Sequence, residues 1–230
     1  MITLAIDSTA KAASAALLKD ETVIAEYTQN TGHTHSETML PMAQAVMNAA
    51  GVTPDDVDLF AISAGPGSFT GVRIGISLIK GLCFGKNKPI AALSSMSTLA
   101  RNLEGYEGVV CPVMDARRNQ VYTAIFRDGI RQTEDMLIPC SELEEMLRGY
   151  DCPIYFTGDG YDLARRLIEL PNIKHTPVRL RLQNAVSVAL EGIRCYNENI
   201  NIFTDTEVMP IYLRASQAER ERLERIKKND

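Results

Sequence analysis

The chain has 230 residues, 45% of them hydrophobic and 23% charged, and its formal net charge is -5. A chain of this length can form one large domain or two small lobes that each bury a core, and its hydrophobic content excludes a disordered protein. The negative charge argues against unaided nucleic-acid binding, which depends on a basic surface that neutralises phosphates.

The N-terminal sequence and the cysteines indicate where the protein resides. The first ten residues, MITLAIDSTA, lack the basic start and long apolar run of a secretory signal, and no stretch of ~18 uninterrupted apolar residues follows. The five cysteines are an odd number without a Cys-x-x-Cys pair, which argues against a disulfide framework and a zinc ribbon. We therefore expect reduced thiols in a cytoplasmic protein that does not contact a membrane.

Residues 1–104 are predicted to form the first α/β lobe. Three short strands in a meander come first, over residues 2–7, 14–18 and 22–27. A helix over residues 36–50 follows, with Ser36 as its cap and Gly51 at its end. The lobe is completed by a buried strand (59–65), a sharp GPGSFT loop, a helix (71–84), a strand (89–93) and a helix (95–103).

Residues 105–230 are predicted to form the second α/β lobe and a charged tail. A hairpin over residues 109–126 opens this lobe, as the meander opens the first, and crossover connections follow in both. Its further elements are a strand near Met136, a helix (141–148), a strand (153–158) and helices (162–168 and 184–196). From Arg214 onward, cations alternate with glutamates, which we interpret as a solvated, partly helical tail. RNA contact by this tail within a larger complex is the alternative.

Two loops of the first lobe carry residue types that can bind a phosphate or its metal. The turn after the first strand offers a carboxylate, hydroxyls and N–H groups, and the GPGSFT loop leads into a helix N-terminus. The turn is either a vestigial nucleotide loop or an ordinary turn, because it lacks glycine. The glycines of the loop admit the close approach of either a ligand or a neighbouring helix. The candidate nucleotide-binding or anion-binding residues are Asp7, Ser8, Thr9, Gly65, Gly67 and Ser68.

The helix over residues 71–84 is apolar on two faces, which a helix covering one sheet does not need. Leaving either face in water would forfeit roughly 1.5–3 kcal/mol for each large side chain. We therefore expect a subunit interface built from this helix and the helix over residues 36–50. Coverage by the chain's own second lobe or first helix is the alternative. The predicted interface residues are Met39, Ala43, Val46, Val72, Gly75, Ile76, Ile79 and Cys83.

The histidines and serines do not form a recognisable catalytic or metal-binding pattern. His33 and His35 are close in the sequence to Glu37, but a distant third histidine exists only at position 175. No Gly-x-Ser-x-Gly elbow accompanies Ser68. We therefore expect neither a metal site nor catalytic residues.

Five segments together resemble the TsaB (YeaZ) family of bacteria, in order and over nearly the whole chain. They are IDSTAKAASAALL, HSETMLPM, GPGSFTGVRIGISLIKGL, MDARRNQVY and PIYLR. The resemblance implies a two-lobed, actin-like ATPase or ribonuclease H-like (ASKHA) fold with mixed sheets flanked by helices. It also implies a subunit of the assembly that attaches a threonylcarbamoyl group to adenosine in tRNAs that read ANN codons.

In this assembly the catalytic relative TsaD carries a His-x-x-x-His pair on a helix after a strand that begins with proline. Anchoring on Pro89 places Ser95 and Leu99 at the two histidine positions, and leucine cannot ligate a metal. The resemblance therefore implies a non-catalytic subunit that requires no cofactor and docks TsaD through its two long helices.

The resemblance also implies several further partners. A TsaE ATPase joins the assembly, ATP or ADP can bind at the subunit boundary, a homodimer forms in isolation, and tRNA is contacted only through the complex. A nucleotide-binding ATPase or phosphotransferase of the actin-like superfamily remains the alternative function.

Overall fold

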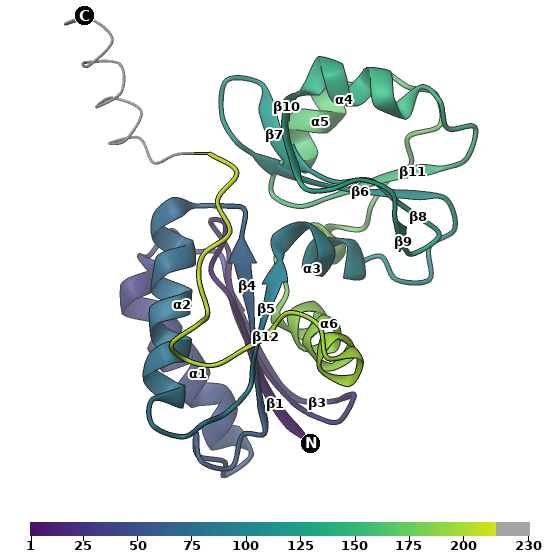
Figure 1. The fold of residues 1–230 in the computed structure, drawn as a ribbon. Helices are drawn as coiled ribbons and strands as arrows, with labels where there is room; N and C mark the ends of the chain where they lie inside the picture. The colour runs from purple at the N-terminus through teal and green to yellow at the C-terminus, as the bar shows by residue number, and fades with distance from the viewer. Residues whose placement is uncertain (215–230) are drawn as a thin grey trace, which may run out of the picture.

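The computed structural model describes residues 1–214, which form two α/β lobes joined through a shared apolar interface (Figure 1). The helix α3 (Ser95–Arg101) lies between the lobes and packs on the first strand of the second lobe. Its Met96 and Leu99 are buried in this interface. The charged tail predicted beyond Arg214 lies outside the described residues. In the described part of the chain, no helix is long and apolar enough to cross a membrane.

The first lobe is built on a six-stranded mixed sheet with the order β12-β5-β4-β1-β2-β3. The strand β1 pairs antiparallel with β2 and parallel with β4, and β4 pairs parallel with β5. Because β1 and β4 are central and covered on both faces, they are buried along nearly their whole length and do not alternate between buried and exposed residues. The strands are β1 (Ile2–Asp7), β2 (Ala13–Lys19), β3 (Thr22–Gln29), β4 (Leu59–Gly65), β5 (Ile90–Ser94) and β12 (Ile202–Phe203).

Helices α1 (His35–Ala49) and α2 (Phe69–Cys83) cover one face of this sheet, and α6 (Ala185–Glu198) covers the other (Figure 1). Along β1, Leu4 and Ile6 face α1 and α2, whereas Ala5 faces α6. The predicted cap of α1 is wrong. Thr34 occupies the N-cap position, and no side chain caps the helix.

The second lobe contains the sheet order β10-β7-β6-β8-β9, with β11 pairing parallel to β6. Its strands are β6 (Val109–Asp115), β7 (Gln120–Thr123), β8 (Phe126–Arg127), β9 (Ile130–Arg131), β10 (Met136–Pro139) and β11 (Ile154–Thr157). Its helices are α4 (Cys140–Leu147), α5 (Tyr161–Leu167) and a short 3-10 helix (Val178–Leu180). The hairpin predicted to open this lobe is present as β6 and β7.

The predicted division into residues 1–104 and 105–230 is wrong, because the chain returns to the first lobe. Helix α6 covers the first sheet, β12 pairs with β5, and Val208 is buried in the first core. The second lobe therefore ends shortly before α6. The periodicity of α6 shows that one of its faces is buried, but it does not show which sheet that face covers.

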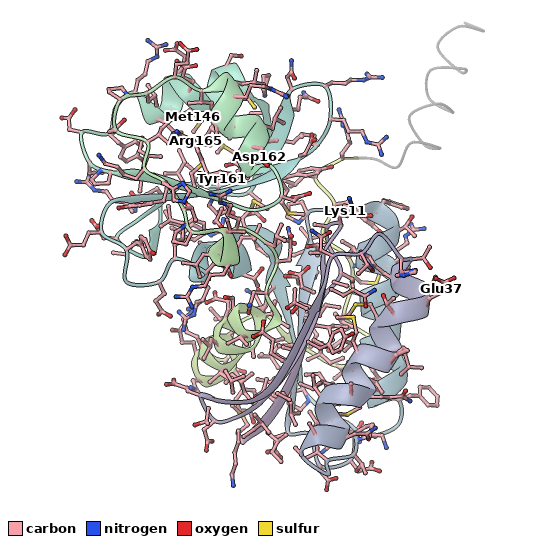
Figure 2. The ribbon with its side chains drawn as sticks, turned by 180° about the vertical axis from the view of Figure 1, so that it is seen from behind. Lys11, Glu37, Met146, Tyr161, Asp162 and Arg165 are labelled. Atoms are coloured by element: carbon pink, nitrogen blue, oxygen red, sulfur yellow. The ribbon has the colours of Figure 1, made fainter. Side chains whose placement is uncertain are left out.

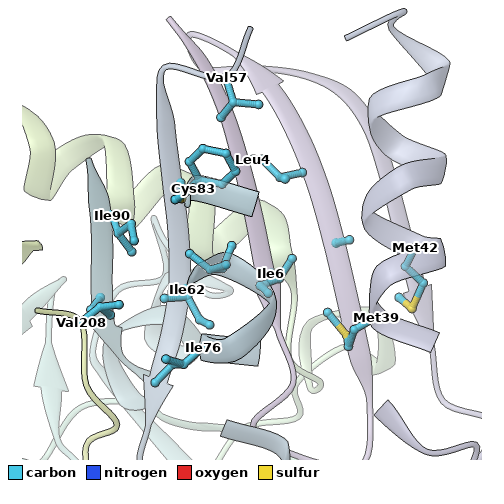
Figure 3. Packing of buried hydrophobic residues seen from close by; sticks show 14 of the residues in the cluster. Leu4, Ile6, Met39, Met42, Val57, Ile62, Ile76, Cys83, Ile90 and Val208 are labelled. Carbon is cyan, nitrogen blue, oxygen red and sulfur yellow. The ribbon is translucent and has the colours of Figure 1, made fainter. Parts of the chain in front are cut away.

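The apolar faces of α1 and α2 were also assigned incorrectly in the sequence analysis. The eight predicted interface residues are buried inside the monomer. Figure 3 shows three of them, Met39, Ile76 and Cys83, in the core of the first lobe, and Gly75 packs beside Ser8. The other apolar face of α2, formed by Ile74, Leu78 and Leu82, is only partly buried. These three side chains pack at the edge of the core and keep part of their surface exposed to solvent. The residues that were predicted to form a subunit interface and are instead buried in the monomer are Met39, Ala43, Val46, Val72, Gly75, Ile76, Ile79 and Cys83.

Ile76 and Leu78 offer a direct test of this orientation. Ile76 is 5% exposed, so Ile76→Ala should lower the free energy of unfolding by about 2–4 kcal/mol through lost burial and a cavity. Leu78→Ala removes a half-buried side chain and should cost only about 1 kcal/mol. Urea denaturation of both variants measures the difference. Equal losses would contradict the orientation of α2.

Candidate functional site

A cavity of about 1050 Å³ lies between the two lobes. The first lobe lines it with the end of the β1–β2 turn, the entry of α1 and the start of α2, and the second lobe lines it with the end of β6. The C-terminal segment, residues 211–214, forms a further wall. Figure 2 shows Lys11, which lies in the β1–β2 turn, where the first lobe faces the second. The cleft therefore brings together segments that are far apart in the sequence.

Asp7 lies beneath the cleft and is 1% exposed. Its Oδ1 accepts hydrogen bonds from the Thr9 amide at 2.9 Å and the Thr9 hydroxyl at 2.6 Å. Its Oδ2 is buried without a partner among residues 1–214. Burial raises the pKa of Asp7 and outweighs the hydrogen bonds from Thr9, which act in the opposite direction. The carboxyl group of Asp7 therefore stabilises the β1–β2 turn through its hydrogen bonds with Thr9.

The glycines of the GPGSFT loop and of α2 pack against this same turn. The Ser68 amide donates to the Thr9 carbonyl at 2.6 Å, and the Ser8 hydroxyl donates to the Gly71 carbonyl at 2.8 Å. A Cβ atom at Gly67 would collide with the Thr9 carbonyl, and one at Gly71 with the Ser8 carbonyl. The close neighbour that these glycines admit is the backbone of the β1–β2 turn, which is neither the ligand nor the helix expected from the sequence.

The six candidate anion-binding residues are thus brought together, but only some of them reach the cleft. Thr9, Gly67 and Ser68 line it. Asp7 and Ser8 are buried behind it, and Gly65 faces the C-terminal segment, where a Cβ would meet the Ile211 carbonyl. Ser68 also caps α2, because its hydroxyl accepts from the Gly71 amide at 3.2 Å.

Asp159 lines the cleft from the second lobe, and the sequence analysis missed it. It lies in a Gly-Asp-Gly turn between β11 and α5. The sequence signal that could have indicated this residue is the pair of glycines between a strand and a helix, which resembles the glycine loop of the first lobe. Gly158 has φ 110°, and a Cβ at Gly160 would lie 3.0 Å from the Val113 carbonyl oxygen. Although the side chain is exposed to the cleft, partial loss of hydration is the main reason that the pKa of Asp159 is raised to about 6, and the nearby charges of Asp115 and Asp7 contribute to this rise.

The remaining candidate groups serve the fold. The Nε2 atom of His35 lies 2.6 Å from the Ala10 carbonyl oxygen, which ties the start of α1 to the β1–β2 turn. Within residues 1–214, no three His, Cys, Asp or Glu side chains are placed to hold a metal. Ser95 and Leu99, at the positions compared with a histidine pair, are buried in α3. All five cysteines are free, and only Cys152 is not fully buried.

Gly71 and Gly81 form a matched pair within α2. Gly71→Ala should destabilise the fold by about 1–3 kcal/mol, because the new methyl group meets the Ser8 carbonyl. Gly81 has open space at the Cβ position, so Gly81→Ala should stabilise the helix by about 0.5–1 kcal/mol. Thermal or urea unfolding measures the sign of the change in unfolding free energy for each variant. Stabilisation by both substitutions would contradict the packing of α2 on the turn.

The raised pKa of Asp7 makes folding depend on pH. The folded chain holds a proton that the unfolded chain releases near pH 3.8, so this stabilisation is present below pH 3.8 and is lost as pH rises through the folded-state pKa. Asp7→Asn removes this titration but keeps an oxygen that can accept from Thr9. The variant should gain stability relative to the parent as pH rises above 4. Urea unfolding at several pH values tests this, and a pH-independent difference would contradict it.

Comparisons with known proteins place the chain in a family. The model of the family described as TsaD, tRNA N6-adenosine threonylcarbamoyltransferase, matches residues 22–220. The tRNA threonylcarbamoyladenosine biosynthesis protein TsaB of Bacillus subtilis is 37% identical over 173 residues, covering 74% of this chain and 76% of the relative. YeaZ from Pseudomonas aeruginosa has a similar structure, with a TM-score of 0.77 and 26% identity over 92% of this chain and 99% of that chain.

A more distant structure places the fold in a wider class. The activator of 2-hydroxyisocaproyl-CoA dehydratase from Clostridium difficile, solved with bound ADPNP, has a TM-score of 0.52 and 11% identity, covering 92% of this chain and 100% of that chain. The expected actin-like fold with mixed sheets flanked by helices is confirmed. The identity and coverage of the B. subtilis relative carry the family assignment beyond the fold. The chain therefore belongs to the TsaB (YeaZ) family of tRNA threonylcarbamoyladenosine biosynthesis proteins, whose sequence the broader TsaD family model also matches.

Proposed function

We propose that this chain is a non-catalytic subunit in the formation of threonylcarbamoyladenosine in tRNA, and that it docks and supports the catalytic TsaD subunit. The observation that carries the proposal is the partly exposed apolar face of α2 on a chain of the TsaB family. Ser95 and Leu99 support the non-catalytic assignment, because both are buried and neither offers the imidazole of a histidine pair.

The proposed α2 docking face consists of Ile74, Leu78 and Leu82, which follow one another at intervals of four residues and form a single stripe. Ser77 and Gly81 lie beside this stripe and are exposed, so the backbone of a second helix can approach closely. The stripe ends next to Phe84, which is 80% exposed. Partly exposed apolar groups that are contiguous on one helix are typical of protein interaction surfaces.

The partner has a related fold, because the TsaD family model also matches this chain. Pairing of equivalent helices from two related lobes buries two similar apolar stripes against each other. In isolation, a second copy of this chain occupies the same face and gives a homodimer. The complete assembly is cytoplasmic and includes a TsaE ATPase, accepts ATP or ADP at the subunit boundary, and contacts tRNA as a complex.

A nucleotide-binding ATPase or phosphotransferase is the second candidate function. The cavity between the lobes and the fold shared with an ADPNP-bound activator favour it. The glycine loop argues against it, because its close contacts go to the chain's own β1–β2 turn. Calorimetry with ATP and magnesium on the isolated chain separates the two. Tight binding that is lost in Asp7→Ala would favour the ATPase.

Leu78→Glu tests the docking face. The charge lies on a half-buried stripe, so the monomer should stay folded while association with the TsaD subunit weakens at least about tenfold, since a buried unpaired charge is costly. Ile130→Glu is the matched control, because Ile130 is 68% exposed on the second lobe. Pull-down and tRNA modification in a reconstituted system are the measurements. Full association and full modification with Leu78→Glu would show that the docking face is misplaced.

A further inference from the structure

The turn between β6 and β7 holds three consecutive non-glycine residues in the left-handed region. Arg117, Arg118 and Asn119 have φ values of 64°, 56° and 59°. Each costs conformational energy, because the Cβ atom crowds the backbone, and such strain persists only where surrounding contacts impose it. Here the Arg117 amide donates to Asp115 Oδ1 at 2.7 Å, and the Gln120 amide donates to the Arg117 carbonyl at 3.1 Å. Two adjacent arginines are thereby presented on a rigid turn.

The C-terminal segment braces this turn from the first lobe. The Ile211 amide donates to the Ala64 carbonyl at 2.7 Å, and Tyr212 stacks on Phe69 of α2 with ring centroids 4.6 Å apart. Arg214 then reaches the second lobe, where its guanidinium donates to the Ala116 carbonyl at 3.2 Å and to Gln120 Oε1 at 2.8 Å. The turn is therefore held beside the cleft by contacts that originate in both lobes.

The residues around the cleft mouth are cationic on a chain whose net charge is -5. Lys11, Arg73, Arg117 and Arg214 line the cleft, and the carboxylates that line it are Asp115 and Asp159. Arg118 lies on the other side of the same turn, where it lines a second cavity of about 600 Å³ together with Arg214.

Three of these cations remain available to a ligand. Lys11, Arg117 and Arg118 are exposed, and within residues 1–214 none of them forms an ion pair, whereas Arg131, Arg148 and Arg194 do. Lys11 comes from the first lobe and Arg117 from the second, so these two charges flank the cleft from both sides, and Arg118 extends the positive charge to the other side of the β6–β7 turn. We call Lys11, Arg117 and Arg118 the cleft rim.

We propose that the cleft rim binds the phosphodiester backbone of the RNA substrate, an inference that rests on the proposed function. Arginine and lysine on an exposed edge suit contacts to successive phosphates, which position an RNA without reading its sequence. A mononucleotide inside the cleft fits less well. Its phosphates would approach the carboxylates of Asp115 and Asp159, and the glycine loop that could cradle them already contacts the β1–β2 turn.

The test uses the complex of the full chain with its TsaD partner and a tRNA transcript, with the dissociation constant measured over a range of salt concentrations. Losing two phosphate contacts in R117S/R118S should weaken binding about tenfold or more at ~0.1 M salt and reduce the slope of log Kd against log salt by about 1.5. The control R127S/R148S removes the same charge from arginines that pair with Asp128 and Glu144 elsewhere. Equal affinities for the two double variants would overturn the proposal.

A second variant separates binding from folding. Glycine adopts positive φ without a Cβ clash, so R117G/R118G should keep or raise the melting temperature while losing the same tRNA affinity. If the serine and glycine variants both lose binding of ATP and keep binding of tRNA, the rim serves a mononucleotide and the proposal is wrong. Partner association is measured in parallel. Failure of the parent chain to bind TsaD would refute the proposed function, whereas an intact complex with unchanged tRNA affinity would refute only the rim.

Discussion

The first lobe depends on the contact between the β1–β2 turn and the N-terminal half of α2. The Thr9 carbonyl accepts from the Ser68 amide and the Ser8 hydroxyl donates to the Gly71 carbonyl, while Gly67, Gly71 and Gly75 admit this turn because they lack a Cβ. Such a close approach fixes the rotation of α2 about its axis as well as its distance from the sheet. Ile76 and Ile79 consequently lie in the core, and Leu78 lies half-buried at its edge. The orientation of the proposed docking face thus follows from a backbone contact at the other end of the helix.

The return of the chain from the second lobe gives the molecule its second constraint. Helix α6 covers the small residues on the far face of the first sheet, where Gly192 approaches Ala61 so closely that a Cβ on the glycine would lie 2.7 Å from the Ala61 Cβ. The segment after β12 then crosses α2 and ends on the β6–β7 turn through Arg214. The two lobes are therefore linked by α3 and by this segment on opposite sides of the fold (Figure 1). Motion between them requires breaking contacts on both sides.

Local patterns predicted most elements to within about two residues, because helix and strand periods are properties of neighbouring residues. The helix predicted over residues 71–84 is observed as Phe69–Cys83, and the one over residues 184–196 as Ala185–Glu198. Contacts distant in the sequence could not be inferred in this way. Nothing in the periodicity of α2 distinguishes the face of Ile76 from the face of Leu78, since both are equally apolar. The glycines were predicted to approach a ligand or a helix, but they pack against a hairpin about sixty residues earlier in the chain. Asp159 comes to line the cleft only because the two lobes fold together, which no local pattern indicates.

These contacts also connect the two surfaces on which the proposals rest. The docking face lies on α2, and Arg73 of the same helix lies over Phe69 at 3.9 Å and donates to the Tyr212 hydroxyl at 2.8 Å. Arg214, two residues after Tyr212, forms hydrogen bonds with the turn that carries Arg117 and Arg118. The distance between a partner bound on α2 and an RNA bound at the cleft rim is therefore set by a short chain of packed groups rather than by a loop. As the proposed docking subunit, this chain contributes to the reaction by positioning, because a fixed geometry between substrate and partner lowers the entropic cost of bringing them together.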